Sequence, residues 1–217
     1  KTAYEIRPRD WSSDVCSSDL CGFCDVRTGR PDAVDEGEPT RIAEAVRAMG
    51  LRFVVLTGVA RDDLPDGGAS IWAETVRAVR AAVPGCGVEV LPSDFKGGER
   101  DIATLIAAEP DVFAHNLETV RRLHDRIRPA FGYDRSLDVL RIAKRLRAGQ
   151  VTKSNVIVGM GERPEEVHEA LRDLRDAGCD LVTMGQYLRP TKHHLPVEDR
   201  KSTRLNSSHV ALSRMPS

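Results

Sequence analysis

The sequence has no long hydrophobic run and no excess of charge of either sign. No apolar stretch approaches the roughly 20 residues that a membrane-spanning helix requires. The formal net charge is −1 over 217 residues, so no general electrostatic field favours nucleic acid. The first twenty residues lack the apolar segment of a secretory signal. We therefore expect one soluble globular domain in the cytoplasm, with neither a membrane nor nucleic acid as its partner.

Cysteine is also scarce, and its number is odd, because the chain has five. That count does not suit a disulfide scaffold, so we expect a reducing compartment and thiols used for ligation. Cys86 and Cys179 stand alone and are typical of small buried hydrophobic residues. Cys21 and Cys24 form a CxxC pair, whose soft thiolates suit an iron–sulfur cluster or zinc. The spacing alone is equally compatible with a thiol–disulfide centre.

The two ends of the chain differ from its middle. Residues 1–20 are rich in Ser and Asp, residues 200–217 are basic and Ser-rich, and neither end has helical or strand periodicity. We expect residues 21–199 to form the domain and both flanks to be foreign tails that resemble translated sequencing-adapter read-through. Ordinary disordered termini are the alternative.

The middle of the chain alternates short apolar runs with amphipathic stretches. The runs predict strands at 53–57, 88–91, 112–114, 156–158 and 181–184, and the amphipathic stretches predict helices around 42–49, 72–83, 102–106, 120–127, 136–146 and 167–174. Such alternation predicts an α/β fold with a parallel sheet and right-handed crossovers. Polar residues follow every predicted strand, which favours a partial barrel with its site at the carboxyl-terminal mouth over a doubly wound sheet.

Several of these polar stretches have a structural interpretation beside the functional one. Asp62 and Asp63 suit a ligand's amine or ribose hydroxyls, or a solvated turn. Asn116 and Glu118 suit a nucleoside, or the start of the next helix. Gly159-Met-Gly161 predicts a tight turn, because a dinucleotide loop needs a third glycine and Glu162 would oppose a pyrophosphate. The adjacent pair His193-His194 is more typical of solvated side chains than of metal ligands.

Taken together, these residues resemble the lipoyl synthases, a family of radical S-adenosylmethionine (SAM) enzymes. The resemblance covers residues 21–197. The strings that carry it are Cys21-Gly-Phe-Cys-Asp-Val, Arg61-Asp-Asp-Leu-Pro-Asp-Gly-Gly68, Phe113-Ala-His-Asn-Leu-Glu-Thr119, Thr152-Lys-Ser154, Gly159-Met-Gly-Glu162, Gly185-Gln-Tyr-Leu-Arg-Pro190 and His194-Leu-Pro-Val197. The cysteine pair is common to the whole superfamily, whereas the strings from Arg61 and from Gly185 are much more specific.

The resemblance implies a partial parallel (βα) barrel of the TIM-like type around a four-iron, four-sulfur (4Fe-4S) cluster that chelates SAM. The implied activity is radical-mediated insertion of two sulfur atoms at C6 and C8 of a protein-bound octanoyl group, with a second cluster consumed as the sulfur source. The implied partners are octanoylated lipoyl domains of 2-oxoacid dehydrogenase complexes, the glycine-cleavage carrier protein and a reducing electron donor.

The same resemblance assigns roles to individual residues. Cys21 and Cys24 match two ligands of the SAM cluster. The positions that match the family's SAM-binding residues are Phe23, Asp62, Asp63, Asn116, Glu118, Arg128, Lys153, Gly159, Glu162 and Gln186. Asn155 stands where the superfamily's GxIxGxxE pattern has its first glycine.

The chain also departs from the family pattern. Cys21 and Cys24 match the second and third cysteines of the cluster motif, whereas the first belongs at position 17, which is Ser17, and Cys16 is one residue out of register. The cysteine motif and the serine that hold the second cluster have no counterpart, nor has the first barrel strand. We therefore expect this chain to be inactive in sulfur insertion and to hold even the first cluster poorly. The alternatives are another radical-SAM enzyme, a non-catalytic zinc-binding fragment and, more weakly, a doubly wound nucleotide binder.

Overall fold

The computed structural model describes residues 21–25, 31–198 and 208–211. The described residues contain one sheet in the order β1-β2-β3-β4-β5-β6. Its strands are β1 (Phe53–Thr57), β2 (Gly87–Leu91), β3 (Val112–Ala114), β4 (Val151–Val158), β5 (Leu181–Gln186) and β6 (Ser208–Ala211). The helices are α1 (Glu38–Ala48), α2 (Ala69–Ala82), the short 3₁₀ helix η2 (Phe95–Gly97), α3 (Glu99–Ile106), α4 (Arg121–Ile127), α5 (Tyr133–Leu146) and α6 (Pro164–Asp176).

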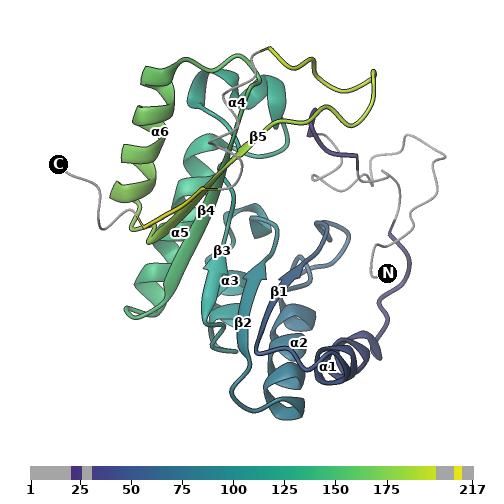
Figure 1. The fold of residues 1–217 in the computed structure, drawn as a ribbon. Helices are drawn as coiled ribbons and strands as arrows, with labels where there is room; N and C mark the ends of the chain where they lie inside the picture. Colours follow the sequence, from purple (N-terminus) through teal and green to yellow (C-terminus); the bar gives the residue numbers. More distant parts are fainter. Residues whose placement is uncertain (1–20, 26–30, 199–207, 212–217) are drawn as a thin grey trace.

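Strands β1 to β5 run parallel and in chain order, and they curl into part of a barrel (Figure 1). The predicted α/β partial barrel is therefore confirmed, and each predicted strand and helix is present. Strand β6 pairs antiparallel with β5. It lies within residues 200–217, where the sequence predicted no strand, and the rest of that flank and residues 1–20 lie outside the described residues.

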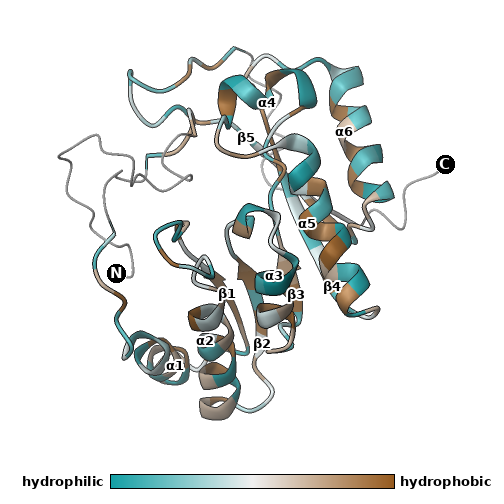
Figure 2. Ribbon diagram, turned by 180° about the vertical axis from the view of Figure 1, so that it is seen from behind, coloured by the Kyte–Doolittle hydropathy of each residue, from teal (hydrophilic) through white to brown (hydrophobic). Residues whose placement is uncertain are grey.

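Helices cover one face of the sheet (Figure 2) and divide its core into two clusters. One cluster joins α1, α2 and α3 to β1, β2 and β3, and the other joins α4 and α6 to β4 and β5. Helix α5 belongs to both, because Leu140 packs in one cluster and Val139 in the other. Burying such side chains contributes about 1.5–3 kcal/mol each. No described helix has the length and apolar character needed to cross a bilayer.

Strand β4 is longer than its sequence predicted, since it begins at Val151 and not at Val156. Its residues alternate between buried and half-buried, as the two faces of a strand require. Thr152 and Ser154 are buried polar residues on the helix-covered face. Their hydroxyls are satisfied, because Thr152 donates to the carbonyl of Gly178 and Ser154 accepts from the N–H of Leu117. Lys153 and Asn155 therefore point to the uncovered face.

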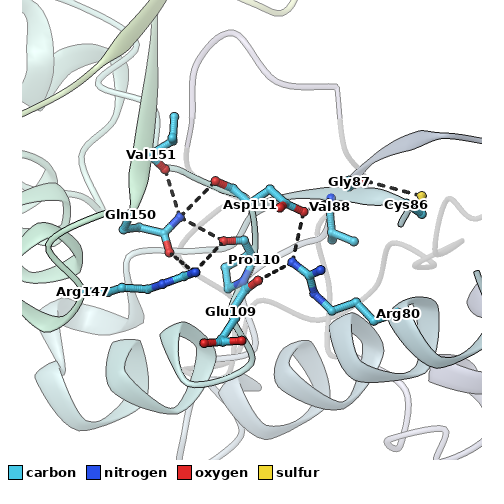
Figure 3. Close-up of polar contacts among 10 residues, drawn as sticks. All are labelled: Arg80, Cys86, Gly87, Val88, Glu109, Pro110, Asp111, Arg147, Gln150 and Val151. Carbon is cyan, nitrogen blue, oxygen red and sulfur yellow. Dashed lines mark hydrogen bonds and ion pairs between the residues drawn. The ribbon is translucent and has the colours of Figure 1, made fainter. Parts of the chain in front are cut away.

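The amino-terminal ends of β2, β3 and β4 are joined by polar side chains (Figure 3). A carboxylate oxygen of Asp111 accepts the backbone N–H of Val88 at 2.7 Å and the guanidinium of Arg80 at 3.1 Å. The buried amide of Gln150 donates to the carbonyl oxygens of Pro110 and Val151, at 3.1 and 3.0 Å. These bonds fix β3 between its neighbours at the end of the sheet opposite the polar strand ends.

Replacement of Gln150 by leucine tests this arrangement. The variant removes the amide that donates to the carbonyls of Pro110 and Val151 and leaves Pro110 only its longer bond from Arg147 at 3.3 Å. We therefore expect the free energy of unfolding to fall by about 1–3 kcal/mol. Urea unfolding followed by circular dichroism measures it. The matched control is Asp138→Asn, which affects only an exposed ion pair with Arg141 and should change stability by less than about 0.5 kcal/mol. Equal effects of the two substitutions would contradict the assignment.

Candidate functional site

The Cys21–Cys24 loop lies at the carboxyl-terminal end of the parallel strands. A turn closes it, with the N–H of Cys24 donating to the carbonyl of Cys21 at 3.1 Å, and the N–H of Gly22 anchors it to the carbonyl of Ile127 at 2.8 Å. Figure 1 shows the loop beside the segment that follows β5. Cys21 and Cys24 are half-buried, whereas Cys86 and Cys179 are buried. The loop thus presents two thiols at the mouth of the partial barrel.

Glu118 reaches this mouth because the chain pairs with β4 again beyond the end of β3, at an isolated bridge between Glu118 and Val156. The N–H of Glu118 donates to the carbonyl of Asn155 at 2.9 Å, and the N–H of Ile157 donates to the carbonyl of Glu118 at 2.7 Å. Glu118 has a φ of 67°, a left-handed conformation that costs a non-glycine residue roughly 1–2 kcal/mol. Strain of this kind tends to occur at functional sites.

The carboxylate of Glu118 is the centre of a buried polar group. One oxygen accepts the amide of Asn116 at 2.9 Å, and the other accepts the amide of Asn155 at 3.1 Å. Asn155 in turn accepts the hydroxyl of Thr183 at 2.8 Å. Because α4 begins at Arg121 with Val120 as its cap, the alternative interpretation of Asn116 and Glu118 as helix-capping residues was wrong.

Arg128 connects this polar group to the cysteine loop. Its guanidinium donates to the backbone carbonyl of Asn116 at 2.6 Å and lies 3.7 Å above the ring centroid of Phe131. Burial raises the pKa of the Glu118 carboxyl, and Arg128 with the two amides offsets part of that rise. Burial also raises the pKa of the Cys21 thiol to about 11, against the lowering effect of Arg128. The positive charge of Arg128 therefore lowers the pKa of both groups, against the effect of burial.

Lys153 lies on the same face of β4 as Asn155 but two residues nearer its start. Its ammonium is bound by both carboxylate oxygens of Glu89, at 2.8 and 3.1 Å. The pair is largely buried, with exposed side-chain fractions of 19% for Lys153 and 8% for Glu89. Because it lies nearer the start of the strands than the Glu118 group, we call it the floor of the mouth. Sequence analysis did not predict Glu89 or Thr183 as site residues. Glu89 had a detectable signal, because it is a carboxylate between the apolar residues Val88 and Val90 of a predicted strand.

The turn after β4 uses the predicted residues Gly159 and Glu162 in a different way. Gly159 and Gly161 have φ of 106° and 103°, which only glycine adopts readily, so the predicted tight turn is confirmed. The carboxylate of Glu162 folds back and accepts the N–H groups of Gly159 and Met160, at 2.6 and 2.9 Å. Glu162 is buried, and these bonds hold the turn in shape.

The remaining predicted residues lie around the same mouth or on its border. Phe23 packs against the core cluster that contains Val156 and Tyr187. Gln186 ends β5 opposite Val158. Asp62 and Asp63 follow β1, the strand at the edge of the sheet. Asp62 lies 3.6 Å from the ammonium of Lys96, and Asp63 lies 2.8 Å from the guanidinium of Arg61. Their roles toward a ligand stay predictions.

Two further features help to delimit the site. A groove of about 440 Å³ beside β1 is lined by residues of α1, β1 and α2, and none of the predicted site residues lines it. The described residues contain no cluster of three or more His, Cys, Asp or Glu side chains suited to a metal ion. Cys21 and Cys24 are thus ligands of the right chemistry for an iron–sulfur cluster, but they supply only part of a ligand set.

Comparison with known proteins defines the class. The model of the radical SAM superfamily matches residues 12–185, and the chain belongs to that superfamily. Its curated relatives are lipoyl synthases: that of Rubrobacter xylanophilus is 56% identical over 85% of the chain, and that of Nocardia farcinica is 58% identical over 82%. The chain covers 57% and 50% of those two proteins, so it spans about half of their length.

Solved structures agree with this class at the level of the fold. Methylornithine synthase (PylB) superposes with a TM-score of 0.63 at 18% identity, over 86% of this chain and 54% of that one. HydG, a maturase of the [FeFe]-hydrogenase, superposes with a TM-score of 0.61 at 12% identity, over 77% of this chain and 40% of that one.

A buried histidine next to the site makes stability depend on pH. His124 in α4 packs edge-on against the Tyr133 ring, with centroids 5.7 Å apart, and neither ring nitrogen has a hydrogen-bond partner among the described residues. Burial lowers the pKa of His124 to about 4, below the usual 6.5. The unfolded chain therefore takes up the proton first, and the stability present above pH 6.5 is lost as the pH falls toward 4.

The variant His124→Phe keeps the ring contact and removes the titration. Between pH 7 and pH 5, the wild-type free energy of unfolding should fall by about 2 kcal/mol more than that of the variant. Urea unfolding at the two pH values measures the difference. The exposed His168, changed to Gln, serves as the control and should keep the full wild-type pH dependence. A variant as pH-sensitive as the wild type would contradict the assignment.

Proposed function

We propose that the chain is the core of a lipoyl synthase, and that the Cys21–Cys24 loop and the Glu118 group bind one 4Fe-4S cluster and SAM side by side. The proposal rests mainly on the end of α4, where Ile127 anchors the cysteine loop through Gly22 and the next residue, Arg128, bonds to the backbone of Asn116 in the Glu118 group. It is supported by membership of the radical SAM superfamily and by identity of 56–58% with lipoyl synthases.

The two thiols would ligate two irons of the cluster, and both must lose a proton to do so. When bound, the cluster supplies the electron that cleaves SAM to a radical able to take hydrogen from an alkyl chain. Arg128 favours the thiolate of Cys21 electrostatically. Phe23, between the two ligands, packs on the core and fixes the loop against the mouth.

The polar group around Glu118 would bind the polar atoms of SAM. The carboxylate of Glu118 and the amide of Asn116 offer acceptors and donors for an amino group or ribose hydroxyls, and the cation Arg128 balances the charge of the carboxylate. The Gly159 turn, which Glu162 holds, and Gln186 border the adenine side of the same mouth. Lys153 belongs to the floor, where its ion pair with Glu89 closes the mouth from below. Asp62 and Asp63 contribute from the loop after β1.

We also propose the biological setting that this activity requires. The substrates are octanoyl groups carried by lipoyl domains of 2-oxoacid dehydrogenase complexes and by the glycine-cleavage carrier protein, and a cellular reductant supplies the electrons. A second cluster serves as the sulfur donor in the complete enzyme. A cytoplasmic location agrees with the small and odd number of cysteines, which does not suit a disulfide scaffold.

A chimera tests the proposed function. Residues 21–185 replace the matching part of the Rubrobacter xylanophilus lipoyl synthase, whose other segments stay in place. After anaerobic reconstitution, we expect it to form lipoyl groups on an octanoylated lipoyl domain, and Cys21→Ala and Cys24→Ala to abolish this. Glu118→Gln keeps the shape and removes the charge, and it should weaken SAM binding about tenfold or more, as loss of a charged hydrogen bond predicts. SAM cleavage without lipoyl formation would indicate a different radical SAM reaction.

The 217-residue chain itself should hold a cluster poorly, because Ser17 stands at the position of the first cluster cysteine. Anaerobic reconstitution with iron and sulfide should give little stable absorbance of the four-iron type. Changing Ser17 to cysteine, with Ser18→Cys as the control, should increase the iron content only in the first case. A stable, stoichiometric cluster in the unaltered chain would contradict the expectation.

A further inference from the structure

The segment that follows β5 returns to the Cys21–Cys24 loop and bonds to its backbone. We call residues 187–195 the clasp. The N–H of Leu195 donates to the carbonyl of Gly22 at 3.1 Å, and Nε2 of His194 lies 3.0 Å from the carbonyl oxygen of Cys24. His194 and Cys24 are 170 positions apart in the chain. In Figure 1 the clasp leaves β5 and meets the loop at the mouth.

The clasp is itself held in place at both of its ends. The N–H of Tyr187 donates to the carbonyl of Val158 at 2.8 Å, which ties the start of the clasp to the end of β4. The hydroxyl of Tyr187 donates to the carbonyl of Leu195 at 2.9 Å. Nε of Arg189 donates to the carbonyl of His194 at 2.9 Å. The position of His194 is therefore determined by strands of the barrel and not by an independent loop.

The imidazole of His194 is fixed from two sides. Because a carbonyl oxygen only accepts hydrogen bonds, Nε2 carries the proton that binds Cys24. Nδ1 lies 2.9 Å from the hydroxyl of Thr191 and accepts from it in the neutral ring. Both ring nitrogens are thus occupied, and the side chain is only 16% exposed. The sequence interpretation of His194 as a solvated residue was wrong, whereas its neighbour His193 is exposed.

The side chain of Leu195 in the clasp also packs closely against the backbone of Gly22 in the loop. A Cβ added to Gly22 would lie 2.8 Å from Cδ1 of Leu195, a distance at which something must shift. Glycine at this position lets the leucine side chain cover the loop backbone between the two cysteines. The loop is therefore enclosed by α4, through Ile127, and by the clasp.

We propose that the clasp sets the conformation of the Cys21–Cys24 loop, and that His194 is a positioning residue which presents the two thiols together. His194 acts on the backbone of Cys24 and not on its sulfur. The proposal rests on the proposed function only for the meaning of the two thiols as ligands. The structural effect on the loop is independent of any catalytic assay.

Alkylation kinetics of the metal-free 217-residue chain test the proposal. The dilute protein is treated with iodoacetamide at fixed pH in the absence of reductant. Peptide mass spectrometry then measures the rate of alkylation at each cysteine. In His194→Phe, the rates at Cys21 and Cys24 should rise about fivefold, the factor of one hydrogen bond of ordinary net strength. His194→Gln, whose amide can still donate to Cys24, should stay near the wild-type rates. His193→Phe, at the exposed neighbour, should have no effect.

The buried thiols of Cys86 and Cys179 separate a local effect from general destabilisation. They should react as slowly in His194→Phe as in the wild type. Thr191→Val, which leaves the ring but removes its second bond, should give a smaller rise at Cys21 and Cys24. Unchanged rates at Cys21 and Cys24, or rates that rise equally at Cys21, Cys24, Cys86 and Cys179, would overturn the proposal. Failure of the chimera to make lipoyl groups would leave these rates unaffected, so the two proposals fail separately.

Discussion

The mouth of the partial barrel depends on a second pairing between the chain and β4 beyond the end of β3. Strand β3 has only three residues, Val112–Ala114, yet the chain pairs with β4 again at an isolated bridge between Glu118 and Val156. That pairing turns a side chain that would otherwise be solvated into the buried carboxylate between Asn116 and Asn155. Arg128 approaches from the end of α4, and the same helix end anchors the cysteine loop through Ile127.

This arrangement has a cost in stability, which is consistent with the ligand site that we propose. The pKa of the Glu118 carboxyl is raised by burial, so the ionised form is disfavoured in the folded chain relative to water. Glu118 also has a left-handed backbone. A core position selected for stability alone would carry neither feature, whereas binding sites commonly contain both perturbed pKa values and strained residues. The nearby Glu89–Lys153 pair, by contrast, satisfies both of its charges internally.

The sequence predicted the fold well, because strands and helices of a parallel α/β protein have distinct hydrophobic periods. It failed where polar residues lie inside an element. The start of β4 was missed because Thr152, Lys153 and Ser154 are polar, although the hydroxyls of Thr152 and Ser154 are satisfied in the core and Lys153 pairs with Glu89. The contacts of Glu118 with Asn155 and of His194 with Cys24 could not be predicted either. They depend on how segments 37 and 170 residues apart meet in space, and local pattern contains no information on that.

The account's central claim is that the cysteine loop and the Glu118 group form one site. A crystal structure of the reconstituted chimera with SAM, with iron located by its anomalous scattering, tests it most directly. The account predicts iron bonded to the sulfurs of Cys21 and Cys24, and polar atoms of SAM hydrogen-bonded to Glu118 and Asn116. Iron at the two thiols with SAM bound elsewhere, for example in the groove beside β1, would contradict the claim.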